Sequence, residues 1–277
     1  MRDPAAVAAF IGSYTSELQT PLGRTFPSTN LPSVNAQVNE YKFRMGSFRI
    51  MNQLSLGICL LPVLLAACAQ QTLFQSDFDS TTVGQPPAHA QTVGTANISG
   101  PPGSVVVVAS PVQTGGKWVQ IARPNDPETI VAFQGNLAQF AGDGSYTCAA
   151  TLFIPTGQAV ASLQFEQFNQ PVANSFNGFL HLDFQKDGTI RIDDLPSTVF
   201  GTFPHDQPFI VQVTLNINPT PTAHIVLAGA GTSGQKDYAI QTPLIPLARQ
   251  FGAVRLWMGF PWTGPFDATN VVVTKSQ

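Results

Sequence analysis

Five side chains have the types and spacing of a ligand-binding surface: Gln164, Glu166, Asp183, Arg255 and Trp257. Each alternates with apolar residues in a stretch that is typical of a β-strand, so each is expected to face away from the core. An aromatic plate beside carboxylates, an amide and a guanidinium suits a sugar, whose ring has apolar faces and hydroxyl edges. The alternative is a solvated sheet face that carries weak cross-strand ion pairs.

These residues do not form a known catalytic pattern. After position 68 the only glutamates are Glu128 and Glu166, and the histidines are scattered without the spacing of metal ligands. The sequence contains no Gly-x-Ser-x-Gly elbow and no phosphate loop. We therefore predict no catalytic residues, although a Glu166/Asp183 pair leaves open a polysaccharide-acting enzyme with an unrecognised site.

Two further sets of residues are weaker candidates for a site. Trp262 lies in a loop with two prolines, where it is either a stacking platform or a plug at the end of the fold. Asp77, Asp79 and Asp267 lie near the two ends of the folded part of the chain, where they would ligate a structural Ca²⁺ if they met. Ordinary surface aspartates are the alternative, and no other cofactor is predicted. Trp118, at the start of a strand, is predicted to be core.

The composition favours an all-β protein. Of 277 residues, 43% are hydrophobic and only 10% are charged, and the chain has 23 glycines and 23 prolines. Hydrophobic content of this size supports a packed core, and many turn formers with few charges favour strands over helices. The net charge is −3 and the chain has no run of Lys and Arg, so it lacks the electrostatic surface that nucleic acid needs.

One strand candidate precedes the loop at 80–103, and the others recur regularly after it, separated by turn formers. Only 136–141 and 244–251 are candidates for short helices, and 80–103 is predicted to be loop with at most one short strand. About thirteen short strands in one domain require two packed sheets or a barrel. The candidates are approximately 71–78, 104–109, 117–122, 128–134, 145–154, 159–168, 178–185, 189–193, 208–217, 223–229, 236–241, 253–260 and 268–274.

Two stretches predict local register. In 209–217 the odd positions are all apolar, which is typical of a long strand with one buried face. In 178–193 a three-residue loop, Lys186–Gly188, pairs Phe184 with Ile190, Leu182 with Ile192, Asp183 with Arg191 and His181 with Asp193. This register requires a positive φ at Gly188.

An export signal precedes the strands. The run Leu54–Leu65 is apolar, which is too short to span a bilayer but typical of a signal-peptide core, and Lys42, Arg44 and Arg49 supply positive charge before it. The sequence Leu-Ala-Ala-Cys at 65–68 resembles the lipobox of bacterial lipoproteins. The resemblance implies that the chain is cut before Cys68 and that a lipid is attached to this cysteine. Ala69, where an aspartate would signal inner-membrane retention, favours the outer membrane.

The chain before the signal is unusual, because signal peptides begin near the start of a protein. Residues 1–44 are either a disordered extension or upstream sequence before a true start at Met45. The predicted organisation is therefore an extension at 1–44, a signal peptide at 45–67 and one β-sandwich domain at 68–277.

The domain also resembles a known family. The stretches 74–79 (FQSDFD), 83–87 (VGQPP), 115–119 (GGKWV) and 266–273 (FDATNVVV) are similar to motifs of bacterial concanavalin A-like lectin and glucanase (LamG-like) jelly-roll domains. This resemblance covers roughly 71–277 and implies a two-sheet antiparallel β-sandwich. Thr269 stands where the family usually has Asp. The E-x-D-x-x-E motif of laminarinase-like hydrolases is absent.

The sequence thus predicts an exported, lipid-anchored envelope protein with a non-catalytic β-sandwich that binds glycan or packs against other envelope components. The alternatives are a hydrolase or lyase acting on polysaccharide and a purely structural lipoprotein. The fold prediction places nine residues between the sheets: Leu163, Phe165, Leu182, Phe184, Val211, Val213, Leu215, Leu256 and Met258.

Overall fold

The computed structural model describes residues 70–112, 116–124, 129–157, 161–168, 172, 177–193, 198–259 and 262–276. Cys68, the extension at 1–44 and the signal peptide at 45–67 lie outside these residues, so lipidation and export stay predictions. Within the described residues, no helix is long and apolar enough to cross a membrane. Cys148 is a buried, free cysteine.

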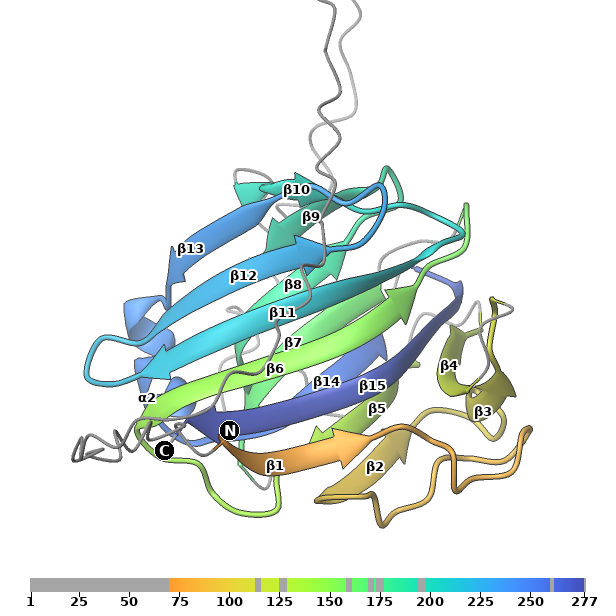
Figure 1. Ribbon diagram of the computed structural model, residues 1–277, viewed down its shortest axis with the longest axis horizontal. Coiled ribbons are helices and arrows are strands. Elements are labelled where there is room, and N and C mark those ends of the chain that lie inside the picture. Colours follow the sequence, from red (N-terminus) through yellow and green to blue (C-terminus); the bar gives the residue numbers. More distant parts are fainter. Residues whose placement is uncertain are drawn as a thin grey trace, which may run out of the picture. The chain divides into compact units, whose positions relative to one another are not determined.

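The described chain forms two antiparallel sheets (Figure 1). Sheet A has eight strands in the order β13-β12-β11-β6-β15-β4-β3, with β1 also paired to β15. The first and last strands are therefore neighbours. The bounds of its strands are β1 Gln70–Ser76, β3 Val105–Ala109, β4 Lys117–Arg123, β6 Gly144–Phe153, β11 Pro208–Ile217, β12 Thr222–Ala228, β13 Gln235–Ala239 and β15 Gly264–Ser276.

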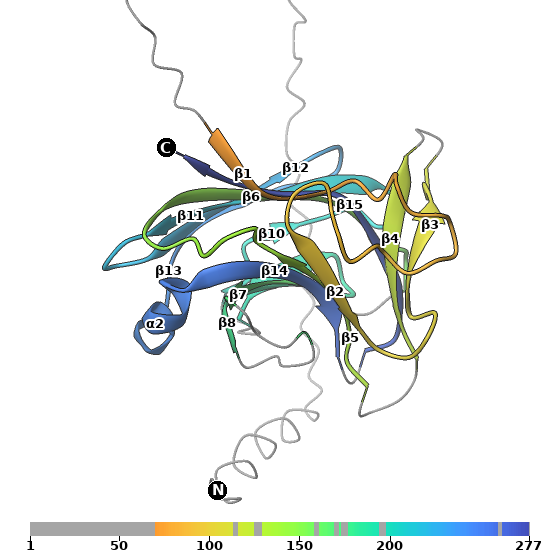
Figure 2. The same cartoon turned by 90° about the horizontal axis from the view of Figure 1, so that it is seen from below.

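Sheet B has seven strands in the order β10-β9-β8-β7-β14-β5-β2 and packs against sheet A, as Figure 2 shows. The chain passes repeatedly from one sheet to the other, so most sheet neighbours are distant in sequence. This is the two-sheet jelly-roll sandwich that the sequence predicted. The bounds are β2 Thr95–Ser99, β5 Val131–Asn136, β7 Ala161–Gln167, β8 Gly178–Phe184, β9 Thr189–Ile192, β10 Gly201–Thr202 and β14 Phe251–Met258.

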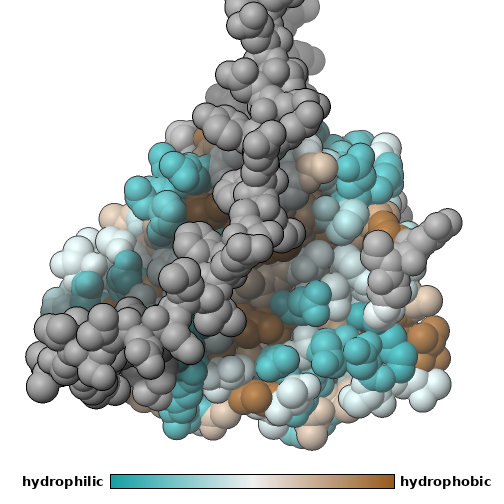
Figure 3. Space-filling view, in the orientation of Figure 1, coloured by the Kyte–Doolittle hydropathy of each residue, from teal (hydrophilic) through white to brown (hydrophobic). Residues whose placement is uncertain are grey.

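Strand alternation builds the core. In β11 the residues Phe209, Val211, Val213 and Leu215 are at most 1% exposed, while Ile210 on the other face is 43% exposed. All nine residues predicted to lie between the sheets are buried. The outer face of sheet A is mixed in character, and Figure 3 shows hydrophilic, pale and hydrophobic residues interspersed on its described part.

The β8–β9 hairpin has the predicted register. Phe184 pairs with Ile190, Leu182 with Ile192 and Asp183 with Arg191, and Gly188 has a φ of 81°. The backbone N–H of Asp193 donates to the carbonyl of His181, which confirms the fourth pair.

One predicted helix is wrong. Residues 137–141 form a connection whose backbone groups bond outside it: Leu137 N–H donates to Gly252 and Ala138 N–H to Leu73. These long-range bonds replace the intrahelical ones. The second candidate contains the short helices η4 (Thr242–Leu244) and α2 (Ile245–Ala248). The five-residue β2 is the one short strand that the sequence allowed within 80–103, and the strand missing from the predicted set is β10, which is two residues long.

Candidate binding face of sheet B

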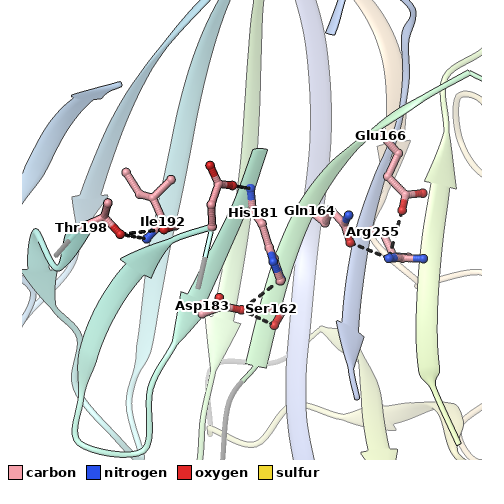
Figure 4. A network of polar contacts seen from close by, with 9 residues as sticks. Ser162, Gln164, Glu166, His181, Asp183, Ile192, Thr198 and Arg255 are labelled. Atoms are coloured by element: carbon pink, nitrogen blue, oxygen red, sulfur yellow. Dashed lines mark hydrogen bonds and ion pairs between the residues drawn. The ribbon is translucent and has the colours of Figure 1, made fainter. Parts of the chain in front are cut away.

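The five predicted site residues lie on three adjacent strands of sheet B, on the side opposite the core. Gln164 of β7 is in register with Arg255 of β14 on one side and His181 of β8 on the other. One step along, Ser162 of β7 is flanked by Trp257 and Asp183. We call this surface the polar face and define it as Ser162, Gln164, Glu166, His181, Asp183, Arg255 and Trp257. Figure 4 shows the first six of these residues.

An ion pair lies at one end of the polar face. Arg255 Nη2 is 3.1 Å from Glu166 Oε1, and both side chains are 0% exposed. The same guanidinium donates to Gln164 Oε1, and its Nη1 donates to the backbone carbonyl of Val172 over 2.9 Å. Val172, in the β7–β8 connection, therefore contributes to covering Arg255. The sequence predicted the orientation of these side chains but not their burial.

Burial dominates the protonation of this pair. It raises the pKa of Glu166 to about 7, although the charges of Arg255 and His181 oppose the shift. Burial likewise lowers the pKa of Arg255, against the attraction of Glu166. The carboxyl group of Glu166 consequently titrates near neutral pH, because removing the charged form from water costs more than the ion pair returns.

A second group of polar contacts surrounds Asp183. Ser162 Oγ donates to Asp183 Oδ1 over 2.7 Å, and His181 Nε2 lies 3.0 Å from the same oxygen. The backbone of His181 is held in turn, because its N–H donates to Asp193 Oδ1. Asp193 has a φ of 54° and accepts a bond from Tyr238 of β13, which links sheet B to sheet A.

Trp257 joins the two groups. Its indole stacks on the His181 ring, with centroids 5.2 Å apart, and the Arg255 guanidinium lies 5.1 Å from the indole centroid. The Nε1 atom of Trp257 is buried and has no hydrogen-bond acceptor among the described residues. Trp257 and His181 are half-buried, whereas Gln164, Glu166, Asp183 and Arg255 are at most 4% exposed.

Two contributors to this surface, Ser162 and Gly178, were not predicted, whereas alternation had already placed His181 on the face opposite the core. Ser162 alternates in step with Gln164, so the strand period could have identified it too. Gly178 has no side chain, so strand alternation could not mark it as part of the surface. A Cβ atom on Gly178 would lie 1.7 Å from Gln164 Nε2, so the glycine makes room for the amide that bonds Arg255.

The two other tryptophans lie in different surroundings. Trp118 is 4% exposed, which confirms it as a core residue. Trp262 is half-buried and packs against the core, and its carbonyl accepts a hydrogen bond from Arg123 Nη1 over 2.6 Å. This packing favours the plug over the stacking platform.

The three aspartates proposed for calcium do not assemble. Asp77 and Asp79 line one surface depression, but Asp267 is buried elsewhere and accepts a bond from Gln120. The reason is register, because Asp267 lies in the half of β15 that pairs with β4, whereas β1 pairs with the other half. Lys117 Nζ also donates to the carbonyl of Asp79. No group of three or more His, Cys, Asp or Glu residues suited to a metal exists in the described ranges.

Comparison with known proteins gives a likeness in structure alone. No protein-family model matches the sequence. No curated protein matches it either. Lectin II from Ulex europaeus is 12% identical and has a TM-score of 0.44, with 69% of this chain and 96% of that chain covered.

Two further structures are similar at the same level. Arcelin-5, a lectin-like defense protein from Phaseolus vulgaris, is 10% identical with a TM-score of 0.45, over 75% of this chain and 98% of that chain. The Ca²⁺-bound exoplasmic/lumenal domain of VIP36 is 9% identical with a TM-score of 0.45, over 74% of this chain and 90% of that chain. Similarity at this level carries no information about a ligand or an activity of this chain.

Proposed function

We propose that this chain is an exported lipoprotein of a bacterial cell envelope, anchored through Cys68, and that its polar face binds a glycan. The anchoring half rests on the apolar run Leu54–Leu65, the small residues after it and the cysteine at the cleavage position. The binding half rests on the arrangement around Trp257.

The observation that carries the binding half is the half-buried indole of Trp257, which stacks on the ring of His181 and lies 5.1 Å from the Arg255 guanidinium. These contacts fix the orientation of the indole before a ligand arrives. Its accessible part offers an apolar surface to a sugar ring, and the His181 ring beside it offers a polar group to the hydroxyls.

The residues of the polar face then divide by burial. Trp257 and His181 keep part of their side chains at the surface and make the contacts with the ligand. Arg255 lies under the indole and is fixed by Glu166 and Gln164, so these three residues position the ring. Asp183 holds His181 in the same way.

A hydrolase is the second candidate, because a carboxyl group with a pKa of about 7 suits a general acid. Strand register argues against Glu166 and Asp183 as a catalytic pair. Asp183 lies opposite Ser162, which is four positions along β7 from Glu166. Four positions correspond to about 13 Å, beyond the ~5–10 Å separation of carboxyl groups in glycosidases. Binding is the better supported function.

The test is a glycan array probed with the purified chain, followed by a hydrolysis assay on every glycan that binds. We expect binding to one chemical class of glycan without release of reducing ends. Release of reducing ends would instead establish an enzyme that cleaves polysaccharide, either a hydrolase or a lyase. Failure to bind any glycan would reject both functions and leave a structural lipoprotein.

A further inference from the structure

The beginning of β1 constrains how an anchored domain would sit on its membrane. Gln70, the first residue of β1, is only two positions after Cys68. Two residues of extended chain span about 7 Å at most. A lipid on Cys68, which is part of the function proposed above and on which this inference rests, would hold this end of the sandwich against the bilayer.

Register identifies the other strand ends that share this position. Gln70 pairs with Ser276 at the end of β15, and Lys275 beside it pairs with Tyr146 near the start of β6. Gly144, which opens β6, pairs with the last residue of β11.

The start of β12 and the end of β13 lie at the same end of the sheet, since Thr222 pairs with Ala239. Figures 1 and 2 show the start of β1, the end of β15 and α2 at the same end of the sandwich, which we call the anchor end.

The anchor end carries exposed apolar residues on two connections. Phe140, between β5 and β6, is 50% exposed and packs edge-on against Phe168. The segment Thr242–Ala248, which follows β13 and forms η4 and α2, has no charged residue. Its two prolines are exposed, and Leu244, Ile245 and Leu247 are only half-buried.

The two connections form one continuous surface. Phe140 lines a depression together with Pro246 and Arg249, so the loop and α2 are adjacent. An ion pair also joins them, with Arg249 Nη2 3.1 Å from Asp143 Oδ2. Lys275 adds a cation at the same end, where its ammonium donates to the carbonyl of Ala141 over 3.0 Å. An apolar patch with cations at its border is the composition of surfaces that lie in a membrane interface.

We infer that the anchor end, through Phe140 and the apolar residues of Thr242–Ala248, inserts into the interface of the lipid bilayer that holds the Cys68 lipid. The lipid and the patch then act as two membrane contacts on one rigid end, which orients the domain. The strands run away from the bilayer, and the polar face of sheet B lies on the side of the molecule.

The test uses tryptophan as a probe of depth. The full chain with Phe140→Trp is produced in a bacterial host, purified and reconstituted in phosphatidylethanolamine–phosphatidylglycerol vesicles with or without bromine-labelled acyl chains. The control is Val83→Trp, because Val83 is also 50% exposed but follows the other end of β1. Relative to wild type, we expect bromine to reduce the added emission about twofold or more for Phe140→Trp and to leave it unchanged for Val83→Trp.

Each outcome has a defined meaning. Equal quenching of the two variants, or quenching of Val83→Trp alone, would overturn the orientation. So would an unquenched Phe140→Trp protein whose hydrodynamic size shows that the patch is covered by a second copy. Fatty-acid labelling of the same preparations separates the two claims: a labelled but unquenched protein rejects only the orientation, whereas an unlabelled protein rejects the anchor and the orientation with it.

Discussion

Arg255 and Glu166 form an ion pair on the polar face of sheet B, outside the core between the two sheets, yet neither side chain is exposed to solvent. Burial costs this pair more than its attraction returns, since the pKa of Glu166 is raised to about 7 despite the neighbouring cation. The pair is therefore poor support for stability. It is better understood as the arrangement that fixes the guanidinium under Trp257.

The first prediction concerns pH. The pKa of Glu166 is about 7 in the folded chain against an ordinary value of 4.5, so the folded state retains this proton where the unfolded state has lost it. The contribution of Glu166 to the free energy of unfolding should be largest below pH 4.5, fall as pH rises through about 7, and level off above that value. Asp267, whose pKa burial raises to about 6, acts in the same direction. Urea unfolding across this range is the measurement.

The matched variant is Glu166→Gln, which keeps the shape of the side chain and removes its titration. Its stability should depend less steeply on pH between 4.5 and 7 than that of the wild type. An unchanged slope would mean that Glu166 does not titrate in this window.

The second prediction tests the fold through one strand. Val213→Asp should unfold the domain, because Val213 is 0% exposed and an unpaired buried carboxylate costs several kcal/mol. Ile210→Asp changes the same strand on its other face, at a side chain 43% exposed, and should leave the domain folded. Circular dichroism of both variants decides, and similar behaviour of the two would refute the assignment of faces.

The third prediction concerns the β8–β9 hairpin. Gly188 has a φ of 81°, which a side chain with a Cβ adopts at a cost of about 1–2 kcal/mol. Gly188→Ala should destabilise the domain by about this amount, and Gly188→Asn by less, because Asn tolerates the left-handed region. Thermal unfolding of the pair is the check, and an Asn variant as unstable as the Ala variant would argue against backbone strain as the cause.

The fourth prediction tests the anchor. Cys68→Ser removes the only thiol at the predicted cleavage position, so the protein should move from the membrane fraction to the soluble fraction and lose metabolic fatty-acid label. Wild-type protein that takes up no label would show that the lipobox interpretation is mistaken.

Local patterns made much of the fold predictable. Alternation in 209–217 identified the buried face of β11, and the loop length fixed the pairing of Phe184 with Ile190. Both follow from the two-residue period of a strand, which needs no long-range information. The predicted helix at 136–141 failed because its backbone bonds depend on Gly252 and Leu73, which lie far away in sequence.

The candidate site was predictable in its residues but not in its assembly. Alternation placed Gln164 and Arg255 on faces opposite the core. Their contact requires β7 and β14 to be neighbours, although the two residues are 91 positions apart in the sequence. Their burial depends partly on the carbonyl of Val172, for which the sequence has no marker. The same limit explains why the three aspartates predicted to ligate calcium do not meet, since the register of β15 separates Asp267 from Asp77 and Asp79.

The most direct test of the central claim is calorimetric titration of the glycan identified on the array into wild type and Trp257→Ala. If the polar face binds the glycan, Trp257→Ala should lose about 1–3 kcal/mol of binding free energy, which raises Kd about 5- to 150-fold, and should remain folded. Gln212→Ala, on the exposed face of sheet A, is the control and should bind like wild type. A folded Trp257→Ala variant with unchanged affinity would contradict the claim and remove the polar face as the binding site.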